Sequence, residues 1–482
     1  MERSIDLIII GLYLVGVAIF GIIAGGKQKT VNDYFLGSSS VPWWAVCFSI
    51  VAAETSTLTF ISIPGLAYLT NLNFLQVTIG YLIGRIIVAV YFLPQYYKGE
   101  LSTAYAYLED RFGHKTRAFA SIVFLFTRTA ADGVRLFATA IPLKLLLDIS
   151  YPTAIIMIAV ITLIYTSTGG LKGIIWVDVL QMFIYIGGAS VAGYLLINNY
   201  LPNGWQSVLD AANLENKLSV INWGFDKGIA GFFSQPYTLI GGILGGAFLS
   251  MASHGTDQLI VQRLLSTKDL KKSQKAIIGS GVIVILQFAL FLLVGVALYA
   301  FYGVTNMKAD EIFPKFIIEN LPVGISGFVI AGLFAAAMST LAGSISSLSS
   351  STMLDLYKPF SKSIDDKKDL KISRMFTLMW AALLVCAAIF FMNSSQVVVE
   401  LALSIASFTY GGLLGTFLLG LFVKKAKQED ALAGFVSGIF IMIAVISLKL
   451  VAWTWFTFIG VFTTLIIGSL LSLLTKNSKS EL

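Results

Sequence analysis

The sequence predicts an all-α integral membrane protein with about thirteen transmembrane helices. Of its 482 residues, 57% are hydrophobic and only 12% are charged, whereas a soluble domain carries about 25% charged residues. Apolar stretches of about 20 residues recur from one end of the chain to the other, and this is the length that an α-helix needs to cross the hydrocarbon core of a bilayer. The sequence lacks the alternating stretches of about ten residues that are typical of membrane β-barrels.

Hydropathy places the predicted spans along the whole chain. The first apolar run, 5–25, has full span length and no small-residue cleavage site, so we interpret it as a retained helix and not as a signal peptide. The loops between the spans are too short to form a catalytic or signalling domain. The predicted spans lie near residues 5–25, 42–63, 73–95, 118–147, 152–168, 173–199, 228–252, 275–303, 323–352, 373–393, 396–422, 430–448 and 451–474.

The basic residues predict the orientation. With the N-terminus outside and the C-terminus in the cytoplasm, about 23 of the 33 Lys and Arg fall on the inner side and about 6 on the outer side. The net charge of +7 is then explained by orientation in the cell (inner or plasma) membrane and by attraction to anionic lipid. It does not indicate nucleic acid binding.

Residues 52–60, AAETSTLTF, place a carboxylate and several hydroxyls inside an otherwise apolar span. A charge at this depth costs about 2.5–3.5 kcal/mol, so an intramembrane acid indicates function. Hydroxyl side chains compete with helical hydrogen bonds, and Thr is also β-branched. We therefore expect the helix to unwind here. Unwound backbone at this depth is tolerated where it lines a cavity or is buried in protein.

A second hydroxyl-rich span, AAAMSTLAGSISSLSSSTMLD, covers residues 335–355. On its own it has two interpretations, because small residues also let membrane helices pack closely. Carbonyl and hydroxyl oxygens are the ligands that hard cations prefer. The two spans together therefore favour a site of neutral oxygens for a monovalent cation such as Na⁺.

The chain also contains the motifs DYFLGSSSVPWWAV (33–46), SIPGLAY (62–68), YTSTGGLKGIIWVDVLQ (165–181), GTDQLIVQR (255–263) and AAAMST (335–340). With these motifs it resembles the sodium:solute symporter family over nearly its whole length. That family includes the sodium/glucose cotransporters and the proline, pantothenate and sialic acid symporters. The resemblance implies a LeuT-type fold, in which two five-helix inverted repeats hold the substrate and ion sites near the membrane midplane. The implied organisation is a leading helix at 5–25, repeats at 42–199 and 228–422, two trailing helices at 430–474 and a cytoplasmic tail at 475–482.

The resemblance also implies a sodium site. Its ligands would be the carbonyl oxygens of Ala52, Thr55 and Ala336 and the hydroxyl oxygens of Ser339 and Thr340.

Some family members hold a second sodium ion with an acid and two serines. Asp178 matches the acid, but Ala342 and Gly343 stand at the serine positions. We therefore predict one Na⁺ per cycle, with Asp178 hydrogen-bonding hydroxyls that support the first site.

The solute is expected to bind beside the unwound segment. Glu54 is the first candidate, although it could instead pair with an intramembrane arginine and only hold helices together. Other candidates are Ser56 in the segment, Gln76 on the third span, and Ser250, Ser253 and His254 on the seventh.

A further candidate set is Arg128, Asp132 and Arg135, spaced i, i+4 and i+7 on one helix face. It carries one excess positive charge, which could offset Glu54 or bind a carboxylate through a guanidinium fork. These charges favour a charged or zwitterionic solute.

The sequence thus predicts a secondary active transporter that couples inward sodium flow to uptake of a small polar organic solute by alternating access, and not an enzyme, because no nucleophile constellation is present. A sodium/sugar symporter is an alternative, although Leu403 stands where sugar carriers are expected to have glutamine. A solute-binding sensor without net transport and a sodium channel are alternatives from other classes. Titration of Glu54 or Asp178 would permit proton coupling. The oligomeric state stays open and is compatible with a monomer.

Overall fold

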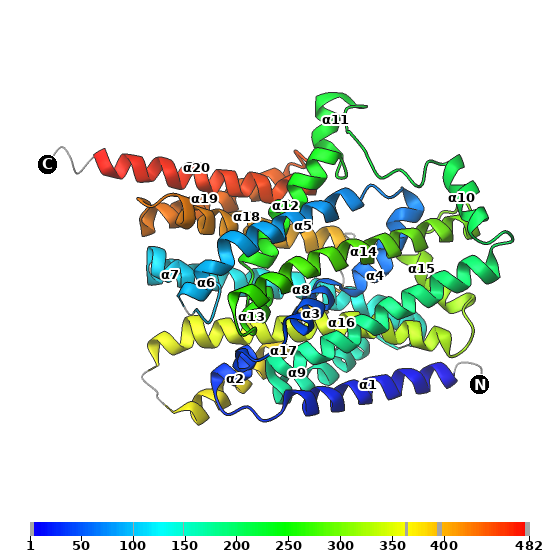
Figure 1. Cartoon of the computed structure of the whole chain (residues 1–482), viewed down its shortest axis with the longest axis horizontal. Helices are drawn as coiled ribbons and strands as arrows, with labels where there is room; N and C mark the ends of the chain where they lie inside the picture. Colours follow the sequence, from blue (N-terminus) through cyan, green and yellow to red (C-terminus); the bar gives the residue numbers. More distant parts are fainter. Residues whose placement is uncertain (1–3, 100, 148, 362–364, 393–397, 478–482) are drawn as a thin grey trace.

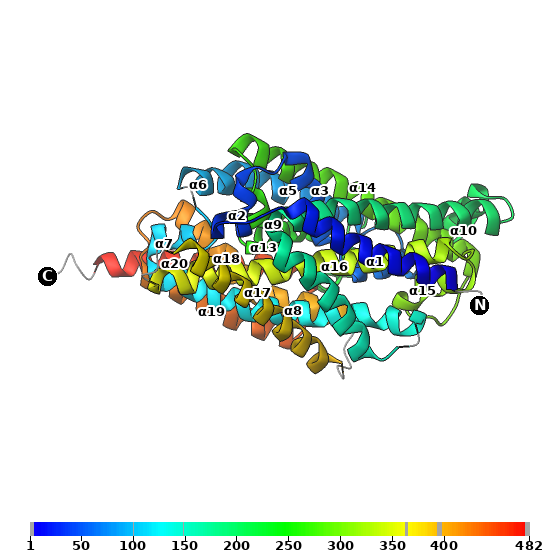
Figure 2. The same cartoon turned by 90° about the horizontal axis from the view of Figure 1, so that it is seen from below.

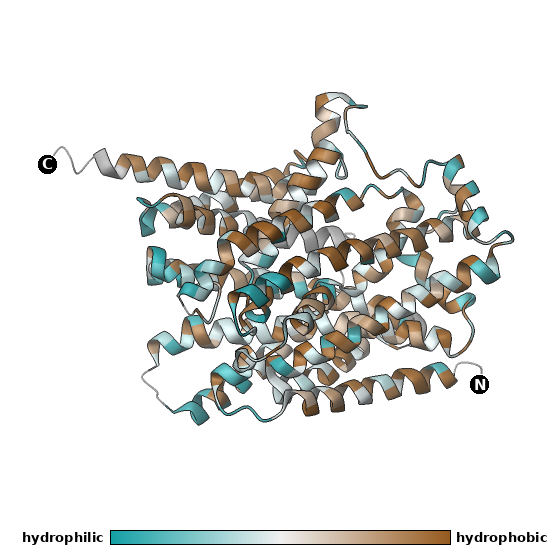
Figure 3. Ribbon diagram, viewed as in Figure 1, coloured by the Kyte–Doolittle hydropathy of each residue, from teal (hydrophilic) through white to brown (hydrophobic). Residues whose placement is uncertain are grey.

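The computed structural model describes residues 4–99, 101–147, 149–361, 365–392 and 398–477, and this part of the chain contains helices and no strand. The long helices run roughly parallel to one axis (Figure 1). α1 (Ser4–Gly25) begins at one end of the bundle, and α20 (Phe456–Asn477) ends at the other. Hydrophilic residues are more frequent towards both ends (Figure 3). This is the arrangement expected of a protein that crosses a bilayer.

Each predicted span coincides with helix over most of its described residues. In this part of the chain, nine helices are long and apolar enough to cross a membrane, or ten if the bent pair α2–α3 counts as one span. The thirteen predicted crossings are therefore not all supported by length and composition alone. The remaining α-helices are α2 (Val31–Leu36), α3 (Trp43–Glu54), α4 (Thr57–Leu69), α5 (Leu75–Ile87), α6 (Leu93–Lys98), α7 (Ala106–Phe112), α8 (His114–Leu147), α9 (Tyr151–Leu195), α10 (Trp205–Leu214), α11 (Gly228–Ser234), α12 (Leu239–Gly255), α13 (Gln258–Leu265), α14 (Leu270–Tyr302), α15 (Ala309–Glu319), α16 (Ile325–Ser351), α17 (Asp366–Phe391), α18 (Val398–Phe422) and α19 (Gln428–Ser447).

Two features predicted from the sequence fall partly or wholly outside what the structure describes. Of the tail predicted at 475–482, residues 478–482 lie outside the described residues, and 475–477 continue α20. The side chain of Leu403, which bears on the sugar alternative, also lies outside them.

α9 accounts for two predicted spans. It bends at Gly170, whose φ of 57° and ψ of −165° interrupt the helix. Glycine adopts a positive φ without the steric cost that a Cβ brings. α1 packs along α9 and α16 (Figures 1 and 2). Its Asp6 carboxylate accepts hydrogen bonds from the backbone N–H groups of Gly324 and Gly327, so it caps the N-terminus of α16.

The predicted unwinding in AAETSTLTF is confirmed. α3 ends at Glu54, α4 begins at Thr57, and both Thr55 and Ser56 are extended. The N–H of Thr59 donates to the Ser56 hydroxyl at 3.4 Å, so Ser56 caps the second half of this broken helix.

A second broken helix, which the sequence analysis did not predict, lies between α12 and α13. The predicted span at 228–252 lies within the apolar stretch Gly228–Gly255, which the structure divides into α11 and α12. Thr256 and Asp257 interrupt the helix, and Asp257 Oδ1 accepts from the N–H of Leu259 at 2.9 Å. An acid at an N-cap position is the sequence signal that predicts this break.

The hydroxyl-rich α16 is a continuous core helix. Every residue from Val329 to Ser351 is buried. α9, α1, α17, α8, α13 and α3 all contact it. A helix with so many buried hydroxyls requires polar partners on its neighbours, and these partners form the candidate site.

Candidate functional site

The break in the first helix meets the middle of α16. The Thr340 hydroxyl lies 3.5 Å from the carbonyl oxygen of Ala53 and 3.2 Å from that of Ala336. On the other side of the break, the Thr57 hydroxyl lies 3.3 Å from the carbonyl oxygen of Leu333. The structure thus brings together the two segments that supply the predicted sodium ligands. All the predicted ligands are buried: Ala52, Thr55, Ala336, Ser339 and Thr340.

The donor set at this junction suits a small hard cation. The last helical hydrogen bond of α3 joins the N–H of Thr55 to the carbonyl of Val51. The last carbonyls of a helix have no donor within that helix, so those of Ala52 and Thr55 are available to a ligand. Hydroxyl and carbonyl oxygens of this kind are cation ligands.

Asp178 lies beside this junction and is fully buried. The hydroxyl of Ser339 donates to Asp178 Oδ1 at 2.6 Å, and that of Ser49 donates to Oδ2 at 2.5 Å. These are the hydrogen bonds to hydroxyls that the sequence analysis expected of Asp178. The Ser339 oxygen keeps its lone pairs, so it can still accept a cation while it donates to the carboxylate.

Arg263, which sequence reasoning missed, balances the charge of Asp178. Its Nη2 lies 3.0 Å from Asp178 Oδ2, and its Nε donates to the Ser49 hydroxyl at 2.8 Å. A Cβ placed on Gly343 would lie 2.8 Å from Arg263 Nη2. The guanidinium therefore fills the space beside one of the positions at which the resemblance expects a serine. Arg263 ends the motif GTDQLIVQR, so the charged residues of this motif were the sequence signal that could have identified it.

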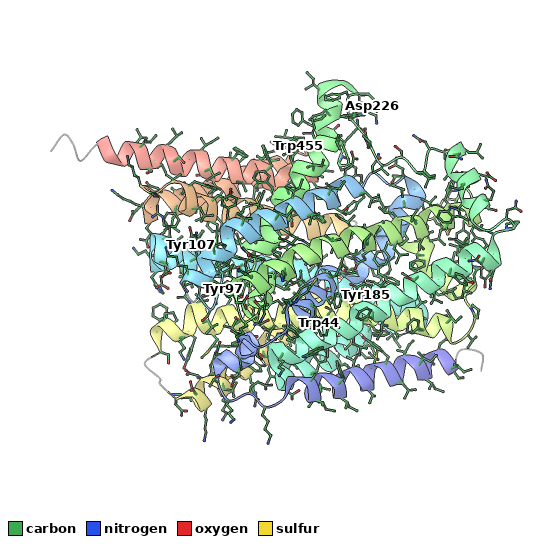
Figure 4. All side chains as sticks on the ribbon, viewed as in Figure 1. Trp44, Tyr97, Tyr107, Tyr185, Asp226 and Trp455 are labelled. Atoms are coloured by element: carbon green, nitrogen blue, oxygen red, sulfur yellow. The ribbon has the colours of Figure 1, made fainter. Side chains whose placement is uncertain are left out.

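Gln287 and Tyr185 form a chain of hydrogen bonds that ends at Thr55 in the helix break. Gln287 Nε2 on α14 donates to the Thr55 hydroxyl at 2.8 Å, and the Tyr185 hydroxyl donates to Gln287 Oε1 at 3.0 Å. Tyr185 lies within the bundle (Figure 4). Neither residue belongs to a motif that the sequence analysis used.

Glu54 forms an ion pair with Arg85, so the structure shows the pairing with an intramembrane arginine that was the alternative to a solute contact. His254 Nε2 also lies 3.5 Å from the Glu54 carboxylate. Arg85 Nη1 donates to Ser280 at 2.9 Å. Arg85 has no exposed side-chain surface, whereas 21% of the Glu54 side chain is exposed. Glu54 is therefore the more exposed residue of the pair.

The other polar candidates are engaged with protein groups. Gln76 Nε2 donates to the carbonyl of Tyr237 at 3.0 Å, and Ser250 donates to the carbonyl of Tyr81 at 2.9 Å. Ser253 contacts His254 Nδ1 at 2.8 Å. Ser56, in the break, stays partly exposed. The structure brings Glu54 and His254 together, whereas Gln76 bonds the segment between α10 and α12.

Arg128, Asp132 and Arg135 share one face of α8, as predicted. The prediction that this cluster carries one uncompensated positive charge is wrong. Arg128 pairs with both Asp132, at 2.6 Å, and Asp257, at 2.8 Å. Arg135 pairs with Asp132 at 2.8 Å. Asp257, 129 residues from Arg128 along the chain, makes the cluster neutral.

A narrow pocket, with room for about one water molecule, borders this cluster. Arg135 is 23% exposed, so one guanidinium reaches the solvent-accessible side. The Tyr410 hydroxyl on α18 donates to Asp257 Oδ2 at 2.8 Å and closes one wall. The lining residues are Val123, Phe124, Thr127, Arg128, Ala131, Arg135, Asp257, Thr409, Tyr410 and Leu413.

Comparisons with known proteins agree with this architecture. The sodium/sialic acid symporter NanT of Aliivibrio fischeri is 29% identical over 98% of this chain and 94% of its own. The sodium/sialic acid symporter SiaT of Proteus mirabilis is 29% identical over 90% and 87%, and the sodium/glucose cotransporter of Vibrio parahaemolyticus is 27% identical over 90% and 84%.

The solved structure of a Na⁺-coupled sialic acid symporter, in a substrate-bound outward-open state with a Na⁺ site, has a TM-score of 0.87 and 27% identity and covers 98% of both chains. The family model for sodium:solute symporters matches residues 34–438. The chain therefore belongs to the sodium:solute symporter family, whose named members here are sodium-coupled membrane carriers.

Proposed function

We propose that this protein couples the inward movement of Na⁺ to the uptake of a small polar organic solute by alternating access. The observation that carries the proposal is the junction between the first broken helix and α16, where the Thr340 hydroxyl lies 3.5 Å from the carbonyl oxygen of Ala53 in the last turn of α3. The relatives named above are sodium-coupled symporters, and their similarity extends over most of this chain. An ion that binds one conformation better than the other shifts the equilibrium between them, and this differential affinity is the basis of coupling.

We propose a LeuT-type topology of thirteen spans, with repeats at 42–199 and 228–422 between the leading helix and two trailing helices. The two helix breaks support it, because each falls in the first span of a proposed repeat, at Thr55–Ser56 and at Thr256–Asp257. The ends of the described chain lie at opposite ends of the bundle, which fits an odd number of crossings. The distribution of Lys and Arg supports an outer N-terminus and a cytoplasmic C-terminus.

One sodium ion would bind to Ala52, Thr55, Ala336, Ser339 and Thr340, with Asp178 as support. The guanidinium of Arg263 stands beside Asp178 and Gly343, where it supplies a fixed positive charge. A second cation at that carboxylate would meet this charge at close range and would be repelled. This supports a stoichiometry of one Na⁺ per cycle.

The solute would bind near Glu54 and Ser56 at the first break, with Arg135 on the side of the pocket. Both ionic side chains are partly exposed, and each is paired with an opposite charge. Such a pair can exchange its internal partner for a charged group of a ligand, so we retain the preference for a charged or zwitterionic solute. Sugars belong in any test, because a sodium/glucose cotransporter is among the relatives.

Thermal stability of the detergent-purified protein tests the proposal. The apparent Tm is compared in NaCl and in choline chloride, with a panel of sugars, neutral amino acids and carboxylates including sialic acid. A ligand that binds the folded state raises the apparent Tm. We expect a sodium-specific rise that one solute class enlarges. No sodium-specific shift with any solute would contradict sodium coupling and redirect the search to proton coupling.

A further inference from the structure

α13, the second half of the second broken helix, is completely enclosed. All of its residues, Gln258 through Leu265, are buried. Gln258 bonds the backbone N–H of Ala104 and the Ser350 hydroxyl, and Gln262 bonds the carbonyl of Phe35 and the Ser346 hydroxyl. With every residue buried and both glutamines bonded to neighbouring segments, α13 is closed off from solvent in this conformation. The basic loop that follows it places this closed side in the cytoplasm in the proposed topology.

Asp257 lies at the break between α12 and α13, and its two carboxylate oxygens accept hydrogen bonds from different partners. Oδ1 accepts from the N–H of Leu259 and caps α13. Oδ2 accepts from Arg128 Nη1 on α8 and from the Tyr410 hydroxyl on α18, both at 2.8 Å. The start of α13 is thereby fastened to two helices, one from each proposed repeat.

We infer that Arg128, Asp257 and Tyr410 form an inner clasp: it holds α13 shut against the cytoplasm and has to open for solute release. The inference rests on the proposed function. It goes beyond it by assigning these residues to a gate rather than to the solute. Buried charge pairs of this kind strongly resist the loss of one partner, and interfaces that contain them tend to have discrete arrangements.

The clasp is also connected to the proposed sodium segment. The Ser344 hydroxyl lies within hydrogen-bond distance of both the Asp132 carboxylate and, at 2.9 Å, the carbonyl oxygen of Thr340. Asp132 in turn holds Arg128. Occupation of the sodium site would stabilise this stretch of α16 and, through Asp132, the closed clasp. Bound sodium is therefore expected to keep the cytoplasmic side closed until the ion leaves.

Cysteine accessibility tests the clasp directly. Val261 on α13 is fully buried and close to cysteine in size, so Val261→Cys is the reporter, in a background with Cys47→Ala and Cys386→Ser. Inside-out vesicles receive a membrane-impermeant maleimide in NaCl or in choline chloride. Tyr410→Phe removes one hydrogen bond to the carboxylate, and Asp257→Asn removes the charge pairing while keeping a capping side chain.

We expect Tyr410→Phe to raise the labelling rate about tenfold, the factor that corresponds to a hydrogen bond to a charged group. Asp257→Asn should raise it further, and NaCl should slow labelling relative to choline chloride in the parent. Tyr194→Phe is the matched control, because Tyr194 is largely exposed on α9. Equal labelling in the parent, Tyr410→Phe and Asp257→Asn would overturn the clasp.

The two proposals fail differently. The absence of a sodium-dependent Tm shift would contradict sodium coupling. The labelling rates of the parent and the variants in choline chloride would still test the clasp, because that comparison needs no sodium. A sodium-dependent Tm shift together with unchanged labelling in both variants overturns the clasp alone. Size-exclusion profiles and the Tm of each variant establish that faster labelling does not come from unfolding.

Discussion

Asp178 and Arg263, 85 residues apart in the chain, form an ion pair with an Oδ2–Nη2 distance of 3.0 Å, and neither side chain has exposed surface. The pair joins α9 to α13, and through the Ser339 hydroxyl it reaches the proposed sodium site. Removing one partner of a buried pair leaves a charge without compensation, whereas removing both is much less costly.

This asymmetry gives the first prediction. Arg263→Gln should lower the free energy of unfolding by about 3–5 kcal/mol, because the Asp178 carboxylate loses its buried counter-charge. The double variant Asp178→Asn with Arg263→Gln should recover most of the lost Tm. Melting curves of the purified variants provide the measurement. A double variant no more stable than Arg263→Gln would show that the pair is not the source of the effect.

Gly343 allows a finer perturbation of the same pair. A Cβ at this position would lie 2.8 Å from Arg263 Nη2 and 3.1 Å from Nη1, so Gly343→Ala should displace the guanidinium and lower the free energy of unfolding in the way that overpacked cores do, by about 1–3 kcal/mol. Gly16→Ala on α1 is the control, because a Cβ there meets nothing within 4 Å. Equal Tm values for the two variants would count against close packing of Arg263 on Gly343.

The sodium site makes a separate prediction. Ser339→Ala and Thr340→Ala each remove one proposed ligand, so the sodium concentration for half-maximal uptake should rise about tenfold or more while expression persists. Ser190→Ala and Thr463→Ala delete comparable hydroxyls that only bond their own helices. Sodium titration of uptake in proteoliposomes measures the effect. Unchanged sodium dependence in both site variants would remove these hydroxyls from the proposed ligand set.

Glu54 can be tested for a role beyond its pairing with Arg85. Glu54→Gln should lower stability, because Arg85 is fully buried and loses its counter-charge. Glu54→Gln combined with Arg85→Met should restore the Tm. Because the Glu54 side chain is partly exposed, we predict that solute affinity nevertheless stays about tenfold weaker, or more, in the double variant, as expected for a lost charged contact. Affinity follows from the solute dependence of the Tm shift, and a return to the parent value would assign Glu54 a structural role only.

The close contact between α1 and α9 supplies a prediction about stability alone. A Cβ on Gly25 would overlap the backbone of Gly169, so Gly25→Ala should force the two helices apart. Small residues permit such close approach in membrane helices. The Tm should fall clearly, whereas Gly11→Ala on the same helix should leave it unchanged, since a Cβ there meets nothing within 4 Å. A matching loss for both would indicate an effect of alanine on α1 itself.

The sequence by itself determined the membrane character, the family and the first helix break. Apolar runs of span length fix the class, because only helices that satisfy their own backbone can occupy lipid in this way. The run AAETSTLTF located the break at Thr55 and Ser56, since hydroxyl side chains compete locally with helical hydrogen bonds. These signals depend on neighbouring residues, and a single chain displays them directly.

The tertiary structure alone decided which charges meet. Arg85 pairs with Glu54, Asp257 neutralises the α8 cluster that the sequence left with an excess charge, and Arg263 pairs with Asp178. The partners are at least 31 residues apart along the chain, on different helices. Helical spacing relates residues three or four positions apart on one helix, but it carries no information about which face of another helix will pack against them. That choice is made when the helices assemble.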